Sequence, residues 1–166
     1  STQKVREAIQ ATWGEVLMHN GKLCDARFSK SCGGVFEEFE YCWEPTHHDY
    51  LVAKHDGADA DNFPDLTVEE NAREWILGSP ESFCNTTDKN ILSQVLNSYD
   101  QETVDFYRWK VEYTQEELSE LIKNRSGVDY GDIIDLVPVA RGTSGRLYRM
   151  KIVGSKKTMI IGKKKK

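Results

Sequence analysis

Apolar residues recur with helical spacing in four parts of the chain, and each part is bounded by residues that start or stop helices. At residues 2–12, Val5, Ala8 and Ile9 form one apolar stripe, and Ser1 or Thr2 can cap the first turn. Two later segments open with a capping box, a Thr followed three residues later by Glu. Those two helices are predicted at residues 67–78 and 114–127, and a further helix, which Asp88 can cap, is predicted at residues 88–96.

A different pattern, strict alternation of apolar and polar residues, surrounds Asn20-Gly21. This dipeptide favours a two-residue hairpin turn because both of its positions adopt positive φ. The turn pairs residues 15–19 with residues 22–29, so that His19 faces Lys22 and Leu17 faces Cys24. We expect one face of this hairpin to lie in the core, namely that of Trp13, Leu17, Cys24, Ala26 and Phe28.

Further strands are expected at residues 50–54, 107–113, 133–140, 147–153 and 157–161. Strands and helices do not alternate regularly, so the fold class is predicted to be α+β. The sheet should be largely antiparallel, with a hairpin near the N-terminus and three to four short helices. Residues 1–166 are interpreted as a single domain, with an acidic, small-residue-rich segment at residues 57–65 as a mobile surface loop.

The composition and charge of the chain limit the classes of partner that it can be expected to bind. The 166 residues carry a net charge of -5, which argues against nucleic acid because phosphate binding needs a basic surface. The four lysines at 163–166 are interpreted as a solvated tail, with an anionic surface as the alternative. No apolar run approaches the ~20 residues that span a bilayer, so no transmembrane segment is expected.

The cysteines allow three interpretations. Cys24, Cys32 and Cys42, together with a nearby histidine (His47, His48 or His55), could bind zinc, although seven and nine residues separate the cysteines. Disulfides are the second interpretation, with Cys42–Cys84 or Cys24–Cys32 as the pairs. Free thiols are the third and the preferred one, so no cofactor is predicted.

Carboxylates gather after Gly33-Gly34. Two carboxylates roughly 5–10 Å apart can hydrolyse glycosidic bonds, whereas a solvated acidic face is the simpler interpretation. The carboxylates in this cluster are Glu37, Glu38, Glu40 and Glu44.

The turn at residues 141–146 has two arginines around Gly-Thr-Ser-Gly. We interpret it as a hairpin connection in preference to an anion site.

Five segments in the same order resemble the SpoIID/LytB family, the stage II sporulation D proteins and amidase enhancers. Ala26–Gly34 (A-R-F-S-K-S-C-G-G) is similar to that family's A-x-Y-x-S-x-S-G-G segment. Ala8–Leu17 resembles its A-V-x-x-T-x-G-x-V-L segment. The other three matches are Glu37, Glu40 and Trp43 with Tyr50-Leu51, then Phe106–Trp109, then Arg141–Arg146.

The resemblance implies work on peptidoglycan outside the cytoplasm, in the periplasm or cell envelope. Sporulation members resemble lytic transglycosylases that cleave glycan strands, and amidase enhancers are linked to stimulating a cell-wall amidase. Glycan strands, and an amidase as a second partner, are therefore the expected partners. The cysteine-rich version here resembles the Bacteroides-type branch, which favours wall remodelling over spore engulfment.

The family's catalytic Glu lies in a G-V-V-x-x-E-M segment, and its zinc ligands lie near a C-Q-x-Y segment; neither occurs here. The chain therefore resembles the middle of the family domain, incomplete at both ends, and is expected to be inactive alone. Glycan binding without catalysis, or amidase stimulation, is the alternative function. The resemblance implies a substrate groove formed by Ser29, Ser31, Cys32, Gly33 and Gly34, with Glu37 and Glu40 positioning the substrate or partner.

Overall fold

The computed structural model describes residues 2–96 and 106–163, and it confirms the α+β class. A two-stranded sheet, β1-β2, and a three-stranded sheet, β3-β4-β5, are both antiparallel. In chain order the elements are α1 (Gln3–Ala11), β1 (Met18–His19), β2 (Lys22–Leu23), α2 (Phe39–Cys42), α3 (Glu69–Leu77), the 3-10 helix η1 (Phe83–Asn85), α4 (Lys89–Val95), α5 (Gln115–Ser126), β3 (Ile133–Arg141), β4 (Leu147–Gly154) and β5 (Thr158–Gly162).

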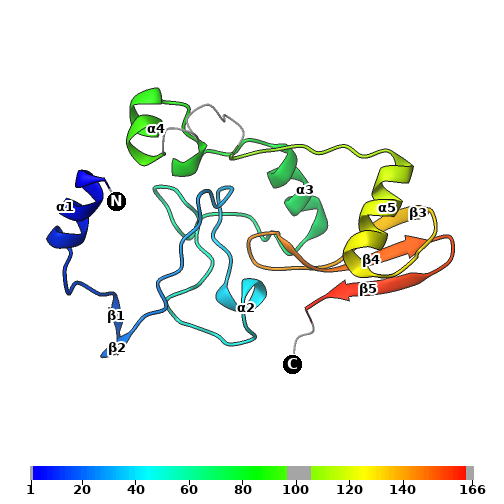
Figure 1. Ribbon diagram of the computed structural model, residues 1–166, viewed down its shortest axis with the longest axis horizontal. Helices are drawn as coiled ribbons and strands as arrows, with labels where there is room; N and C mark the ends of the chain where they lie inside the picture. Colours follow the sequence, from blue (N-terminus) through cyan, green and yellow to red (C-terminus); the bar gives the residue numbers. More distant parts are fainter. Residues whose placement is uncertain (1, 97–105, 164–166) are drawn as a thin grey trace.

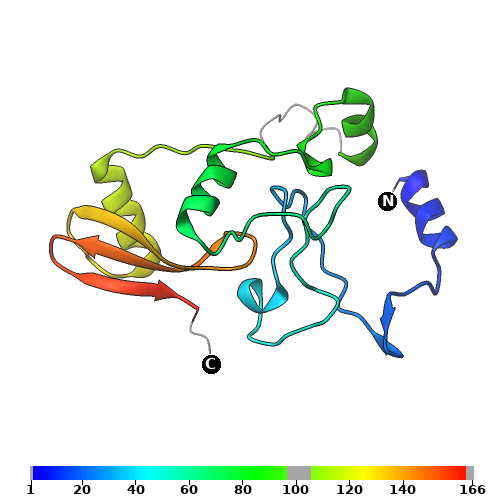
Figure 2. The ribbon, with the colours of Figure 1, turned by 180° about the vertical axis from the view of Figure 1, so that it is seen from behind.

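The elements are spread along the long axis of the molecule, although α4 lies back toward the end that holds α1 (Figures 1 and 2). An N-terminal arm, formed by α1, β1 and β2, lies at one end. A central segment contains α2, α3 and long stretches without regular secondary structure. The three-stranded sheet and α5 form the opposite end. None of the helices in the described part of the chain is long and apolar enough to cross a membrane.

The hairpin in the N-terminal arm has the predicted register, but its predicted core face is wrong. Asn20 and Gly21 have φ of 49° and 73°, as the turn requires, and His19 pairs with Lys22. Yet Trp13 is 84% exposed and Phe28 is 95% exposed. The paired strands are two residues long, and α1 has no buried residue, so the arm forms no core.

Local capping signals predicted three helices well. Thr2 accepts a hydrogen bond from Val5 N at the start of α1, and Asp88 accepts one from Asn90 N at the start of α4. Thr114 and Glu117 form the predicted capping box of α5. Gly127 ends α5 in the left-handed conformation, which a residue without Cβ adopts at low cost.

Three local predictions failed. The box at Thr67 does not form, because the Thr67 hydroxyl donates to Asp65, and α3 begins only at Glu69 without a side-chain cap. Residues 50–54 form no strand. Among the described residues, the isolated β-bridge next to this segment joins Val35 to His55. Residues 107–113 form no strand either. Alternation alone does not make a strand when no partner strand supplies the ladder of hydrogen bonds.

A buried apolar cluster lies between α5 and the three-stranded sheet. Tyr130, Ile133 and Ile152 are its buried centre, and Leu118 and Ile122 of α5 pack against it. The strands follow the predicted meander, with Leu136 opposite Ile152 and Met150 opposite Ile161. This end of the molecule was well predicted because each strand pairs with its neighbour in sequence.

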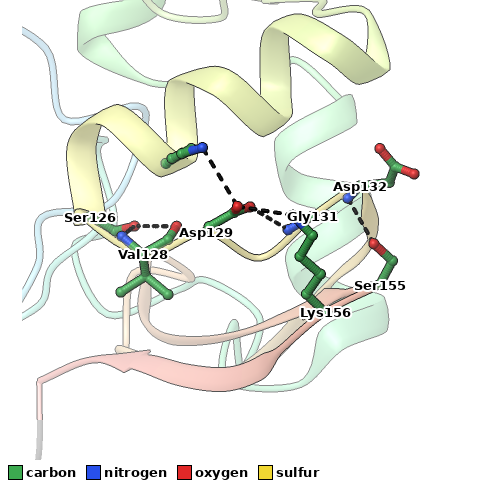
Figure 3. Close-up of polar contacts among 8 residues, drawn as sticks. Ser126, Val128, Asp129, Gly131, Asp132, Ser155 and Lys156 are labelled. Atoms are coloured by element: carbon green, nitrogen blue, oxygen red, sulfur yellow. Dashed lines mark hydrogen bonds and ion pairs between the residues drawn. The ribbon is translucent and has the colours of Figure 1, made fainter.

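The turn after α5 is held by one carboxylate (Figure 3). Asp129 accepts hydrogen bonds from Gly131 N, at 2.9 Å, and from Lys156 Nζ, at 3.0 Å. Lys123 of α5 forms an ion pair with the same carboxylate at 3.5 Å. The Gly131 N–H, followed by Lys156, lowers the pKa of Asp129 to about 2. Asp129 thereby connects α5, the turn before β3 and the turn between β4 and β5.

The β3–β4 hairpin joins the two large parts of the molecule. Figure 1 shows its tip extending from the sheet to the central segment beside α3. Arg141 donates two hydrogen bonds to the carboxylate of Glu69 on α3, at 2.7 and 2.9 Å. Gly145 packs so closely that an added Cβ would lie 3.2 Å from Leu66 Cβ. Of the terminal lysines at 163–166, residues 164–166 lie outside the described residues.

Candidate functional site

A groove with a volume of about 580 Å³ crosses the central segment. That volume suits a ligand of the size of a few linked rings. Five of the lining side chains are aromatic: Phe28, Phe36, Phe39, Trp43 and Tyr50. The remaining lining residues are Arg27, Ser29, Ser31, Cys32, Glu37, Cys42, Leu51, Val52, Lys54 and Arg146.

Four of the seven predicted binding residues line this groove, namely Ser29, Ser31, Cys32 and Glu37. Ser31 Oγ is buried and has no hydrogen-bond partner among the described residues. An unpartnered buried hydroxyl is costly, and a polar ligand group or a water molecule would satisfy it.

Gly33 and Gly34 do not line the groove; they form the turn behind its wall. Their φ values are +67° and +102°, which only glycine adopts easily. A Cβ on Gly34 would lie 2.8 Å from atoms of Ser82, Trp75 and Tyr107. Their close approach is to the protein's own side chains, and the contact of these glycines with a ligand stays a prediction.

Two arginines hold this turn in place by binding its carbonyl oxygens. Arg108 donates to Gly33 O at 3.0 Å, and also to Trp75 O and Gly78 O. Arg146 donates to Val35 O at 3.0 Å and to Cys32 O. Sequence reasoning did not assign these roles, although both arginines lie in segments that carry the family resemblance.

Both arginines of the β3–β4 turn form hydrogen bonds with other groups of the protein. Arg141 is bound to Glu69 and to Gly145 O, and Arg146 to the wall of the groove. Residues 141–146 therefore form a hairpin connection, as predicted, and their guanidinium groups bind groups of the protein itself.

Glu37 connects the groove to the tip of the β3–β4 hairpin. Its carboxylate accepts a hydrogen bond from Ser144 Oγ at 2.6 Å, and the Ser144 and Glu38 N–H groups also donate to it. The neighbouring Glu38 accepts from Thr143 Oγ1 at 3.0 Å. A carboxylate that receives three hydrogen bonds is a fixed acceptor, which suits a positioning role better than proton transfer.

Glu40 lies outside the groove lining. It faces His47, with 3.8 Å between His47 Nδ1 and Glu40 Oε2, and the His47 side chain is 57% exposed. Glu40 lies on α2 and is directed toward His47, so its role in positioning the substrate or a partner stays a prediction.

Arg27 and Trp43 form one edge of the groove. Asp25 accepts two hydrogen bonds from the Arg27 guanidinium, each 2.7 Å long, and this partner lowers the pKa of Asp25. The guanidinium lies over the Trp43 ring, 4.4 Å from its centroid. Held from both sides, Arg27 fixes the Trp43 indole at the groove.

The cysteines do not gather as predicted. Cys32 Sγ lies 3.4 Å from Cys84 Sγ of η1, so neither Cys42–Cys84 nor Cys24–Cys32 is the closest pair. In the part of the chain that the structure describes, the donor atoms that could hold a metal are those of Cys32, Asp56 and Cys84, all within 4.8 Å of one another. The proposed zinc set of Cys24, Cys32 and Cys42 is not brought together there.

Burial raises the pKa of the Cys32 thiol to about 12. Asp56 is held beside it by the main chain: its N–H donates to Gly34 O, and its carboxylate accepts from Cys84 N at 2.9 Å. Cys32 is thus a neutral thiol at physiological pH, not a reactive thiolate.

The fold and the groove define a small α+β protein with an aromatic-lined groove. A family model described as Domain of unknown function (DUF8618) matches residues 37–166, and the chain belongs to this family. The matched range contains Trp43, Tyr50 and Arg146 of the groove but begins after the wall residues Ser29, Ser31 and Cys32. No curated protein and no solved structure matches the chain.

Proposed function

We propose that the groove binds peptidoglycan glycan strands, as a domain of the SpoIID type. The observation that carries the proposal is the aromatic lining next to Ser29–Cys32, the segment with the family resemblance. Sugar rings have apolar C–H faces that pack on aromatic rings and hydroxyl rims that need polar partners. Trp43 and Tyr50 offer the first kind of surface, and Arg27 and Lys54 the second.

The reaction that this binding would serve is lytic-transglycosylase-like cleavage, with the general acid supplied from a segment that corresponds to the family's G-V-V-x-x-E-M. Glu37 would orient the strand from its fixed position between Ser144 and Glu38. Such work belongs outside the cytoplasm, and the localisation is part of the same proposal.

Sedimentation with purified peptidoglycan tests the proposal. We expect the chain to bind, and Trp43→Ala to lower the affinity about tenfold, equivalent to ~1.4 kcal/mol. Trp43 is 53% exposed, so its removal should leave the fold intact. Trp109→Ala is the matched control, because Trp109 is 74% exposed and lies outside the groove lining.

Equal loss of binding in both variants, or none in Trp43→Ala, would remove the groove from the proposal. The supernatant of the same assay reports cleavage. We expect no anhydro-muropeptides from this chain alone, and their release would contradict a catalytic acid outside it.

A non-catalytic module that binds the wall or stimulates an amidase is the second candidate. It is favoured by the lining of the groove: among the described residues that line it, Glu37 is the only one with a carboxylate, and this carboxylate is already bound to protein donors. Adding a cell-wall amidase to the sedimentation assay separates the two. Faster peptide release with the native chain than with Trp43→Ala would support stimulation, and equal rates would oppose it.

A further inference from the structure

Two cysteines from distant parts of the chain meet beside the groove. Cys32 lies in the wall segment and Cys84 in η1, 52 residues later, and their sulfur atoms are 3.4 Å apart. A disulfide needs about 2.05 Å, so a displacement of about 1.4 Å would close the bond. We propose that Cys32 and Cys84 form a reversible disulfide that joins the groove wall to η1.

The difference in solvent exposure between the two cysteines decides which of them reacts first with an external disulfide. Cys84 is half-buried, whereas Cys32 is only 5% exposed, so an incoming disulfide reaches Cys84 first. The Cys84 thiolate attacks one sulfur of that disulfide, the S–S bond breaks, and one thiolate leaves. The sulfur of Cys32 then attacks Cys84 Sγ in the mixed disulfide and expels the second thiolate.

The exchange balances without any other reactant. Two protein thiols are oxidised, one low-molecular-weight or protein disulfide is reduced to two thiols, and the two protons pass to the leaving groups. Asp56 has a carboxylate oxygen within 4.8 Å of both sulfurs, and its charge helps to keep Cys32 protonated until the proton passes to the departing thiolate.

Burial is compatible with both redox forms, because the raised pKa keeps reduced Cys32 a neutral thiol and a disulfide carries no charge either. Zinc is the competing occupant of the same atoms. A structural zinc site takes four ligands, whereas three donors meet here among the described residues. One of the three, the Asp56 carboxylate, already accepts the Cys84 N–H. This disulfide would form whatever ligand the groove binds.

The test uses the Cys24→Ser/Cys42→Ser double variant, in which only Cys32 and Cys84 can pair. In buffers of oxidised and reduced glutathione, we expect its free thiols to fall from two to none. Peptide mass spectrometry should then identify the Cys32–Cys84 link. In the native chain the same link should form, with Cys24 and Cys42 still open to alkylation.

Thermal unfolding measures what the bond does to the fold. Closing a 52-residue loop restricts the unfolded chain, so reduction should lower Tm by about 10 °C in the native chain and in the double variant. Cys84→Ser, with one thiol of the pair removed, should show no change on reduction.

Three results would overturn the proposal. The first is two free thiols in the double variant at every glutathione ratio. The second is a native link that involves Cys24 or Cys42. The third is stoichiometric zinc in the purified protein whose removal by a chelator exposes Cys32 and Cys84.

Discussion

At the scale of single residues, the groove wall depends on one sharp turn. Gly33 and Gly34 both adopt positive φ, and the carbonyl oxygens around them are bound by Arg108 and Arg146. This turn brings Cys32 and Ser31 to the groove while Trp75 Nε1 donates to Gly33 O from behind. Side-chain donors therefore bind the backbone carbonyl oxygens of the wall, in the role that a neighbouring strand has in a sheet.

Gly34→Ala should destabilise the protein by roughly 2–4 kcal/mol, because the new methyl group meets Ser82, Trp75 and Tyr107 at 2.8 Å and the backbone has φ +102°. Urea denaturation measures the loss. Gly14→Ala is the matched control: its φ is +81°, but nothing lies within 4 Å of the new Cβ, so about 1 kcal/mol is expected. Equal losses in both variants would show that the contacts around Gly34 carry no energy.

At the scale of elements, the turn between α5 and β3 responds to pH. The folded pKa of Asp129 is about 2, below the ~3.9 of an unfolded chain. Its contribution to stability is therefore complete above about pH 4 and is lost as the pH falls toward 2.

Asp129→Asn should lower Tm at pH 6, and its difference from the native chain should shrink between pH 4 and pH 2, because in that window the unfolded native chain takes up a proton on Asp129 while the folded chain still resists protonation. Thermal unfolding across pH measures the difference. Asp132→Asn is the control, since Asp132 takes part through its backbone N–H, which donates to Ser155 Oγ (Figure 3). A difference that stays constant with pH would refute the role of the Asp129 charge.

At the scale of the whole molecule, stability is divided unevenly. The C-terminal end has a buried apolar cluster between α5 and the sheet, and the central segment is held by arginines and by the β3–β4 tip. The N-terminal arm contributes no buried residue from α1, β1 or β2.

Deletion of residues 1–23 should therefore change Tm by less than about 2 °C, because the arm buries little apolar surface. Thermal unfolding of the shortened chain is the measurement. Binding to peptidoglycan in the sedimentation assay should also persist, since the groove lining begins at Arg27. A much larger fall in Tm would show that the exposed face of the arm packs on the rest of the protein.

Local signals in the sequence determined the features whose causes are local. The Asn20-Gly21 turn, the cap at Thr114 and the Gly127 stop depend on a few neighbouring residues, and all three were predicted correctly. The C-terminal meander was also predicted correctly, because each of its strands pairs with the next strand along the chain. Together they were enough for the α+β class.

Contacts between distant residues were decided by the tertiary structure alone. Cys32 meets Cys84, Arg146 reaches the carbonyl of Val35, and Ser144 binds Glu37, each across more than fifty residues. The alternation at residues 107–113 predicts a strand, and the apolar face of the arm predicts a part of the core. In the part of the chain that the structure describes, no element pairs with the first or covers the second. Periodicity records which side chains share a face, whereas burial depends on what packs against that face.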